Sequence, residues 1–474
     1  MAPANLLFLF TDQQRQDTLN VYGNDLIDTP NLDAVADESV VFNNAYVTQP
    51  VCTPSRSSIM TGLYPHTNVC TENNVPLTRE YATIAEMLPE EYATGYFGKW
   101  HLGDEVIAQH GFEKNWVSTE EYHAHKTREL YKTRHSSYYY FLKSHGLEPD
   151  AVGDDGFESF SRGFACHLPK ELTKPAFTAS RVSEFIESNQ DQPFVAYVNF
   201  LEPHQPFHGP FDTMYDPANI EFSPTFLQHG DETTPLRVRL LQQRLGQESE
   251  KYYRDVKARY YGLVSLVDYY CGEILDTLRE CGLYDNTIIV FTSDHGEMMG
   301  DHAMMYKTVL YEEAAQVPMF MRLPERGSEQ MRIESPVSQI DLVPTLMELM
   351  GSQPPEHLQG RSLAPSLRNS ETPVPRDVFI EWNGANGFST VEGTRWSLEE
   401  QEKVGGAPSR TVVTPDGWKL NLRADDLCEL YNLNDDPHET QNLYGQPEVK
   451  AIVEDLTERI RRWQEQTDDT VSVT

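Results

Sequence analysis

The chain has 474 residues, of which 39% are hydrophobic, a length that accommodates between one and about four domains. Its 73 acidic residues outnumber 38 basic ones, and the formal net charge is -35 at pH 7. A field of this sign repels a phosphate backbone, so we expect no nucleic-acid partner, and an anionic substrate would need a local basic pocket.

The first apolar run of the chain reads as a strand, residues 5–11, because it lacks a basic leader and reaches Asp12 too soon for a signal peptide. No apolar stretch approaches the length of a membrane span, so we expect no membrane association. The chain as given is expected in the cytoplasm, or in the periplasm or outside the cell if a leader was removed. Six cysteines in so long a chain do not form a disulfide framework, and no C-x-x-C pair suggests zinc.

Four short segments rich in β-branched, aromatic and aliphatic residues each end in a polar cluster. This pattern is typical of buried parallel strands whose carboxyl ends carry the chemistry. Segments of helical period, such as 178–188 and 259–281, lie between them. The alternation predicts an α/β fold with a large central sheet, mixed and mostly parallel, sandwiched by helices. The four strands and their clusters are 5–11 with Asp12 and Gln13, 92–97 with Lys99 and His101, 194–200 with His204, and 287–292 with Asp294 and His295.

A Pro- and Ser-rich stretch at 361–376 predicts a domain boundary, which divides the chain into a large N-terminal domain, 1–365, and a smaller C-terminal unit, 366–474. The smaller unit is expected to hold a short antiparallel sheet and one packed helix. Its strand-like runs are 378–382, 410–413, 418–422 and 429–433, and its helix is near 447–466.

The segment 113–170 is rich in His and Tyr and has no clear period. It predicts an irregular insertion of the kind that shapes a substrate pocket.

The stretch V-C-T-P-S-R places Cys52 directly before Thr53 and Pro54, with Arg56 four positions on. Proline is favoured in a first helical turn because its missing N–H is one of the unpaired donors there. We therefore expect Cys52 at a helix N-terminus, with Arg56 one turn on along the same face. That end of a helix favours an anion and lowers a thiol pKa. The motif indicates an oxyanion site or, alternatively, a buried cysteine beside an ordinary capped helix.

Residues 52–62, C-T-P-S-R-S-S-I-M-T-G, resemble the signature of the type I, formylglycine-dependent sulfatases of the alkaline phosphatase superfamily. Only Met60 departs from it, at a position where the family usually has leucine, and such an apolar exchange is tolerable in a packed helix. Residues 95–103, G-Y-F-G-K-W-H-L-G, resemble the second signature of that family. The resemblance extends to the first strand with its Asp, to S-D-H-G-E at 293–297, and to the tail that begins at Cys428.

The resemblance implies an enzyme, a sulfuric ester hydrolase, in which Cys52 is oxidised to 3-oxoalanine (formylglycine) by a formylglycine-generating enzyme during maturation. Asp12, Asp294 and the carbonyl-derived oxygen at position 52 offer hard donors to Ca²⁺ or another divalent cation. Gln13 adds a neutral donor, and His295 completes the expected set. Many sulfatases have Asp in place of Gln13 and Asn in place of His295, so at these two positions the chain resembles the choline sulfatase and phosphonate monoester hydrolase branches.

The family pattern also assigns the chemistry. One hydroxyl of the hydrated formylglycine attacks sulfur while the metal and Arg56 hold it as an alkoxide, and the sulfated intermediate collapses from the other hydroxyl. The base for this second step is expected to be His101, and Lys99 is expected to neutralise the sulfate oxygens. His204 and Lys307 are the implied donors to the leaving oxygen and to the sulfate.

Asn73 resembles the substrate-binding polar residue of the family, and Asn74 beside it is the alternative. The expected substrate is a sulfated carbohydrate, such as a glycan, or another small organic sulfate. A phosphonate or phosphate monoester or diester is the alternative on the same scaffold, because both groups are tetrahedral oxyanions. A non-catalytic carbohydrate-binding relative is a further alternative, although such a protein ought to have lost Cys52, Lys99 or His101. The oligomeric state is left open.

Overall fold

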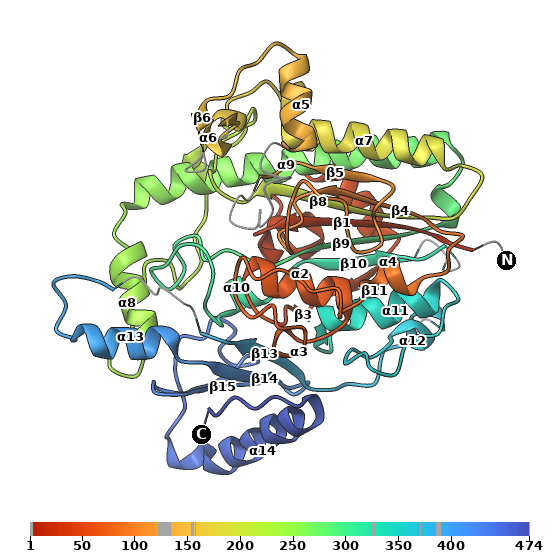
Figure 1. The fold of residues 1–474 in the computed structure, drawn as a ribbon. Helices are drawn as coiled ribbons and strands as arrows, with labels where there is room; N and C mark the ends of the chain where they lie inside the picture. The colour runs from red at the N-terminus through yellow and green to blue at the C-terminus, as the bar shows by residue number, and fades with distance from the viewer. Residues whose placement is uncertain are drawn as a thin grey trace.

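The computed structural model describes residues 3–473 apart from 122–133, 153–155, 157, 325, 327–328, 370 and 385–389. Its centre is an eight-stranded sheet, and a separate four-stranded sheet lies on the C-terminal side (Figure 1). In spatial order the large sheet consists of β11 (Met331–Ile333), β2 (Val40–Phe42), β10 (Met319–Arg322), β9 (Thr287–Ser293), β1 (Asn5–Asp12), β8 (Phe194–Pro203), β4 (Ala93–Gly98) and β5 (Trp116–Ser118).

The large sheet is mixed and mostly parallel, as predicted. β1 lies near its middle and pairs in parallel with β8 and β9. The exception to the common direction is β10, which pairs antiparallel with both β9 and β2. The four predicted strands correspond to β1, β4, β8 and β9, each within a few residues of the expected ends.

Both faces of the large sheet are buried, which explains why its strands are almost continuously apolar. Leu7 and Leu9 of β1 pack into one core cluster, whereas Leu6, Phe8 and Phe10 pack into another on the opposite face. Figure 1 shows two long helices on one side of the sheet and two other helices on the opposite side. These pairs are α7 (Lys174–Ser188) with α9 (Glu250–Glu280), and α2 (Cys52–Thr61) with α11 (Leu342–Leu349).

Helix α9 begins earlier than the predicted segment 259–281. Its first turns already bury Tyr253 and Val256 in the core, and Ser249 caps them by accepting a hydrogen bond from the backbone N–H of Tyr252. Glu250 and Arg254 then form an i,i+4 ion pair on the exposed face. The apolar stripe of this helix therefore begins earlier than predicted, and capping and side-chain pairing support its first turn.

The C-terminal unit has the predicted architecture. Its four strands pair antiparallel in chain order, and Leu456 and Ile460 of the last helix pack against Val412 and Leu420 of the sheet. The division at 365/366 stays a prediction. The elements are β13 (Val378–Trp382), β14 (Ser409–Val413), β15 (Trp418–Arg423), β16 (Glu429–Asn432) and α14 (Lys450–Thr467).

The predicted insertion at 113–170 is more regular than expected in the residues that the structure describes. Its first strand, β5, pairs in parallel with β4 and forms one edge of the large sheet. The three residues of β5 are too few for a period to show in the sequence. The other elements of the insertion are α5 (Ser137–Ser144), α6 (Arg162–Ala165), and the strand pair β6 (Ala151–Val152) and β7 (Glu158–Ser159).

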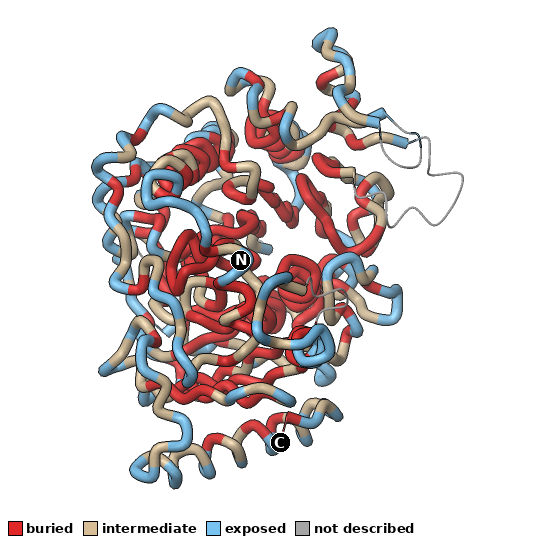
Figure 2. Tube along the Cα trace, turned by 90° about the vertical axis from the view of Figure 1, so that its left-hand side faces the viewer, coloured by how far each residue is buried: buried red, intermediate tan, exposed pale blue. Residues whose placement is uncertain are grey.

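Buried residues concentrate in the middle of the molecule, and exposed ones follow its outer loops (Figure 2). Within the ranges described above, no helix combines the length and apolar character needed to cross a membrane. The shorter elements are α1 (Pro30–Asp37), α3 (Pro65–Asn68), α4 (Ile84–Met87), α8 (Leu236–Leu245), α10 (Glu312–Ala315), α12 (Ala364–Arg368), α13 (Leu398–Gly406), and the paired strands β3 (Ala45–Tyr46) and β12 (Val337–Ser338).

Gly98, at the end of β4, has no room for a side chain. Its φ is +113°, and an added Cβ would lie 1.8 Å from the carbonyl oxygen of Asn199. We expect Gly98→Ala to lower the free energy of unfolding by more than about 3 kcal/mol, because a backbone clash adds to the cost of positive φ. Urea denaturation measures the change.

Gly23 provides the matched control for this prediction. Its φ is +93°, but an added Cβ would have no neighbour within 4 Å. Gly23→Ala should therefore cost only about 1 kcal/mol, the conformational part alone. Equal losses in the two variants would contradict the close approach of Gly98 to Asn199.

Candidate active site

The polar clusters predicted at strand ends meet at the carboxyl edge of the large sheet. Because the strands that carry them are parallel and adjacent, their carboxyl ends lie side by side. The residues delivered there are Asp12 at the end of β1, Lys99 after β4, His204 after β8 and Asp294 after β9.

Cys52 is the first residue of α2 and is only 2% exposed. The helix therefore begins where the Thr-Pro motif predicts, and Arg56 follows one turn later, 1% exposed. The backbone N–H of Thr53, one of the N–H groups without a helical partner at this end, donates to Oδ1 of Asn73 at 3.0 Å. Asn73 thus caps the helix end that holds Cys52.

Arg56 joins the two predicted metal-binding carboxylates. Its Nε donates to Oδ2 of Asp294, and its Nη2 donates to Oδ2 of Asp12, both at 2.8 Å. Its Nη1 donates to the carbonyl oxygen of Lys99 and to Oδ1 of Asn199, both at 2.9 Å. A buried guanidinium requires such a complete set of partners, so Arg56 fixes the orientation of both carboxylates.

The remaining oxygens of these carboxylates lie toward Cys52 and His295. Oδ1 of Asp12 lies 3.8 Å from both Cys52 Sγ and His295 Nε2, and Oδ1 of Asp294 lies 3.5 Å from His295 Nε2. One ligand atom from each of the four buried residues lies within 4.8 Å of the others. Two carboxylate oxygens, each oriented by a cation bound to its partner oxygen, form a donor set that fits a divalent metal ion.

Gln13 connects this cluster to Lys307. Its backbone has φ +68°, and its N–H donates to Oδ1 of Asp294 at 3.1 Å. The side-chain oxygen of Gln13 accepts a hydrogen bond from Lys307 Nζ. Its amide nitrogen donates to Gln205 and to Glu297. The side-chain amide of Gln13 is thereby fixed by Lys307 at its oxygen and by Gln205 and Glu297 at its nitrogen.

The Cys52 thiol lies in an electropositive environment. Its Sγ is 3.2 Å from His295 Nε2. Burial, the largest effect, acts to raise the thiol pKa, and Asp12 acts in the same direction. Lys307, Lys99 and His295 outweigh both and lower the pKa of Cys52 to about 7. The site therefore stabilises negative charge at position 52.

His101 lies beside the N-terminus of α2. Its carbonyl oxygen accepts from Oγ1 of Thr53 at 2.8 Å, and its Nε2 lies 3.0 Å from Oδ1 of Asn74. Its backbone N–H donates to Glu105 at 2.8 Å, which holds a residue with φ +59°. Burial, followed by the charge of Lys99, lowers the pKa of His101 well below its usual value. The imidazole is therefore neutral and able to accept a proton.

His204 contacts a residue that the sequence did not identify. Its Nδ1 lies 2.7 Å from the carbonyl oxygen of Gln205 and 3.3 Å from Nη1 of Arg162. Burial, followed by the charge of Lys307, holds the pKa of His204 well below its usual value. Arg162 comes from α6 of the insertion, where no local motif distinguishes it from a surface arginine. Asn199 was also missed, although an Asn inside the apolar run of β8 is a usable signal.

The predicted site residues form one connected group. We call the group of Asp12, Cys52, Asp294 and His295 the metal-type cluster. It contacts Lys99 through Asp12, and it is linked to Lys307 through Gln13. The hydrogen bond from Gln13 to Gln205 leads to the adjacent His204. On the other side, Asn73 and the main chain of His101 contact α2. The roles assigned to these residues stay predictions.

The model of the Sulfatase family matches residues 4–352, which include the whole of this site. The chain belongs to the sulfatase family. A second model, for the C-terminal region of N-sulphoglucosamine sulphohydrolase, matches residues 300–466. This second match overlaps the first and covers the four-stranded sheet of this sulfatase and most of α14.

Similar proteins agree with this assignment. The uncharacterized sulfatase YidJ of Escherichia coli (strain K12) is 28% identical over 453 residues, covering 94% of this chain and 83% of that protein. An N-acetylglucosamine-6-O-sulfatase of Bacteroides thetaiotaomicron is 26% identical over 528 residues, with coverages of 98% and 87%. This sulfatase is accordingly an enzyme of the sulfuric ester hydrolase class, which argues against the non-catalytic alternative.

Among solved structures, a phosphonate monoester hydrolase from Silicibacter pomeroyi has a similar fold. The TM-score is 0.80 at 24% identity, and the alignment covers 99% of this chain and 98% of that one. At this identity the likeness shows a shared α/β fold.

Proposed function

We propose that this sulfatase hydrolyses a sulfate ester of a carbohydrate, or of another small organic molecule, with a formylglycine derived from Cys52 as nucleophile. The observation that carries the proposal is the position of Cys52. It lies at the N-terminus of α2, within 3.2 Å of His295 Nε2 and 3.8 Å of Asp12 Oδ1. The name of the N-acetylglucosamine-6-O-sulfatase relative supports a carbohydrate substrate.

Asp12, Asp294, His295 and residue 52 would hold the divalent cation, with Gln13 as a further donor. Ca²⁺ is our proposal for the ion because most of these donors are hard oxygens once residue 52 is oxidised. When bound, the ion supplies Lewis-acid stabilisation of the negative charge that develops at the reacting oxygens.

The cations around position 52 have distinct roles in the proposed first step. Lys99 and Lys307 bind the sulfate oxygens, whose charge must be held from binding through to the transition state. Arg56 fixes the carboxylates and favours negative charge on the attacking hydroxyl of the hydrated side chain. As the S–O ester bond breaks, His204 protonates the leaving oxygen.

The proton that His204 needs is linked to substrate binding. We assign the ring proton of His204 to Nδ1, because the carbonyl oxygen of Gln205 lies nearer to it, at 2.7 Å, than Nη1 of Arg162, at 3.3 Å. A neutral ring therefore has no proton on Nε2 to donate. The negative charge of a bound sulfate ester would raise the pKa of His204, against the effects of burial and Lys307. We propose that substrate binding itself makes His204 a proton donor.

His101 serves the second proposed step, in which it takes the proton of the other hydroxyl while the C–O bond to sulfate breaks and the aldehyde re-forms. We expect His101→Ala to react once and then stall, because attack on sulfur precedes the step that His101 serves. An adduct of sulfate mass on residue 52 should then accumulate. Intact-protein mass spectrometry after mixing with an activated aryl sulfate detects it.

Lys99→Ala is the control for this experiment. Lys99 Nζ lies 2.5 Å from Oδ2 of Asp12 and is assigned to the first step, so its loss should leave the adduct scarce. A normal first-turnover burst of phenol without an adduct in His101→Ala would show that the base is misassigned.

A phosphonate or phosphate ester is the second candidate substrate, favoured by Gln13 and His295 at positions where many sulfatases have Asp and Asn. Both residues lie in the site, where we assign them to the metal ion that a sulfate and a phosphonate would share. A hydrolysis screen decides between the candidates, with sulfated monosaccharides, sulfated oligosaccharides, choline sulfate, aryl sulfates and phosphonate monoesters. We expect the highest kcat/KM for a sulfated carbohydrate, and a higher value for a phosphonate monoester would overturn the proposal.

A further inference from the structure

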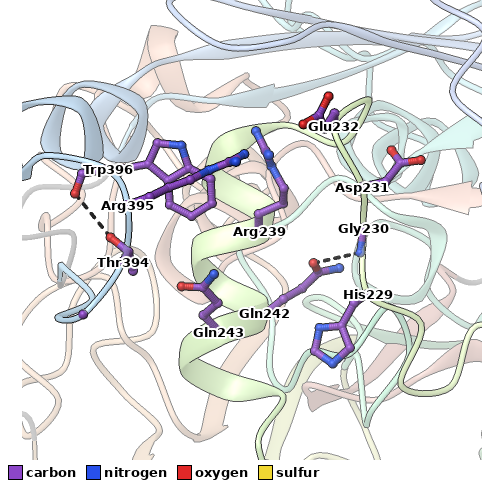
Figure 3. Close-up of a pocket in the computed structure, with 11 residues that line it drawn as sticks. His229, Gly230, Asp231, Glu232, Arg239, Gln242, Gln243, Thr394, Arg395 and Trp396 are labelled. Atoms are coloured by element: carbon purple, nitrogen blue, oxygen red, sulfur yellow. Dashed lines mark hydrogen bonds between the residues drawn. The ribbon is translucent and has the colours of Figure 1, made fainter.

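A pocket lies outside the candidate active site, between α8 and residues 393–396, which precede α13 (Figure 3). Its volume is about 700 Å³, and none of the predicted site residues lines it. Figure 1 places α8 and α13 on the side of the molecule toward which the parallel strands run. The elements that form the pocket thus lie on the same side of the molecule as the edge of the sheet that carries the active site, and they come from the sequence regions that both family models match.

Two arginines flank one tryptophan in this pocket. The guanidinium carbons of Arg239 and Arg395 lie 5.1 and 4.9 Å from the ring centre of Trp396. Cation–π contacts of this length use the face of a guanidinium group rather than its N–H donors. In the part of the chain that the structure describes, Arg239 Nε is buried without a hydrogen-bond partner, and neither arginine forms an ion pair. In a protein of net charge -35, two such cations in one cavity indicate recognition of an anion.

The other lining groups distinguish a saccharide from a bare anion. Gln242 is fixed, since its side-chain oxygen accepts from the backbone N–H of Gly230 at 3.0 Å, as Figure 3 shows. Gln243 and the carboxylates of Asp231 and Glu232 also line the pocket. The carboxylates would repel a free anion, but carboxylate and amide groups pair well with sugar hydroxyls. Guanidinium groups pair with sulfate or carboxylate substituents.

The pocket is connected to the active site through α8. The amide nitrogen of Gln242 donates to the carbonyl oxygen of His302 at 2.8 Å, and Nη1 of Arg237 donates to the carbonyl oxygen of Thr308 at 2.7 Å. The segment held between these two bonds includes Lys307. A ligand bound to α8 would therefore contact the helix that also holds the segment of Lys307, a proposed sulfate-binding residue.

We propose that this pocket binds an anionic saccharide unit of the substrate, sulfated or carboxylated, at a distance from the sulfate ester that is cleaved. The inference rests on the proposed carbohydrate substrate and extends it to an oligosaccharide. Arg239 and Arg395 bind the anionic substituent, and the amide of Gln243 binds a hydroxyl.

The test measures binding of a chondroitin sulfate hexasaccharide by calorimetry in a Cys52→Ala background, so that no turnover occurs. Adding Arg239→Gln and Arg395→Gln should weaken binding by about tenfold or more, because two charge-assisted contacts are lost. Adding Arg244→Gln is the matched control, since this exposed arginine lies on the same helix but outside the pocket. It should leave the affinity within about twofold of the parent. Hyaluronan hexasaccharide, which carries carboxylates alone, shows whether a carboxylate suffices or a sulfate is needed.

Equal affinity of the pocket variant and its parent would overturn the inference, as would an equal loss in Arg244→Gln. A third outcome would also overturn it: neither hexasaccharide binds, but inorganic sulfate binds and loses affinity when Arg239 and Arg395 are replaced. The pocket would then be an adventitious anion site only. The proposed function is tested separately, by measuring sulfate release from sulfate esters by the unmutated enzyme. If no sulfate is released, the proposed function fails, whatever the result of the binding experiment.

Discussion

Cys52→Ala is expected to lower kcat for sulfate ester hydrolysis by about three orders of magnitude or more, because it removes the proposed nucleophile. The fold should persist, since the change deletes a single sulfur atom and leaves α2 with a good helix former. Cys52→Ser should fail as well when the maturing enzyme accepts only cysteine. Steady-state kinetics and a melting temperature on the same preparation separate lost chemistry from lost structure.

Cys271→Ala is the matched control for this loss. Cys271 is as buried as Cys52, but it lies in α9 within the core on one face of the sheet. We expect it to reduce stability by a small cavity term, about 1 kcal/mol, and to keep kcat. Retention of a tenth of the parent kcat in a clean Cys52→Ala preparation would refute the formylglycine mechanism.

The second large effect is expected at the metal-type cluster. Asp294→Asn should lower turnover by about a hundredfold or more and should abolish the rise in melting temperature that added Ca²⁺ gives the parent. Asp294 contributes one oxygen to the cluster and another to Arg56 at 2.8 Å. Its loss therefore removes a ligand and leaves a buried guanidinium with less compensation.

Asp268→Asn serves as the control for this second effect. Asp268 is a buried carboxylate that accepts from the backbone N–H of Leu32 at 2.7 Å, remote in its contacts from the cluster. Its replacement should reduce stability but leave the response to Ca²⁺ unchanged. An unchanged rate from an enzyme shown by elemental analysis to be free of metal would contradict the proposed role of the cluster.

The site was predictable where local sequence rules determine position. Asp12 and Asp294 follow directly on apolar strands, and parallel strands bring their carboxyl ends to one edge. Cys52 was placed by the Thr-Pro pair that starts α2. In these cases the residues adjacent in the sequence determine where the functional residue lies in the fold.

Other features depend on contacts between distant segments, which have no local signal. Arg162 reaches His204 from an insertion that has no readable period. Gln13 was expected only as a metal donor, yet its amide also binds Lys307, which is 294 positions away in the sequence. The pocket at Trp396 likewise depends on how α8 packs beside the C-terminal unit. Tertiary packing, rather than propensity, decides each of these contacts.

The central claim, that Cys52 becomes the nucleophile as formylglycine, is tested most directly by the mass of the tryptic peptide that contains residue 52. From fully active enzyme, we predict a peptide lighter by the difference between a thiol and an aldehyde side chain, and one that reacts with a hydrazide. Its abundance should rise and fall with kcat across preparations of different maturation. Full activity from enzyme in which this peptide retains an unmodified Cys52 thiol would contradict the claim.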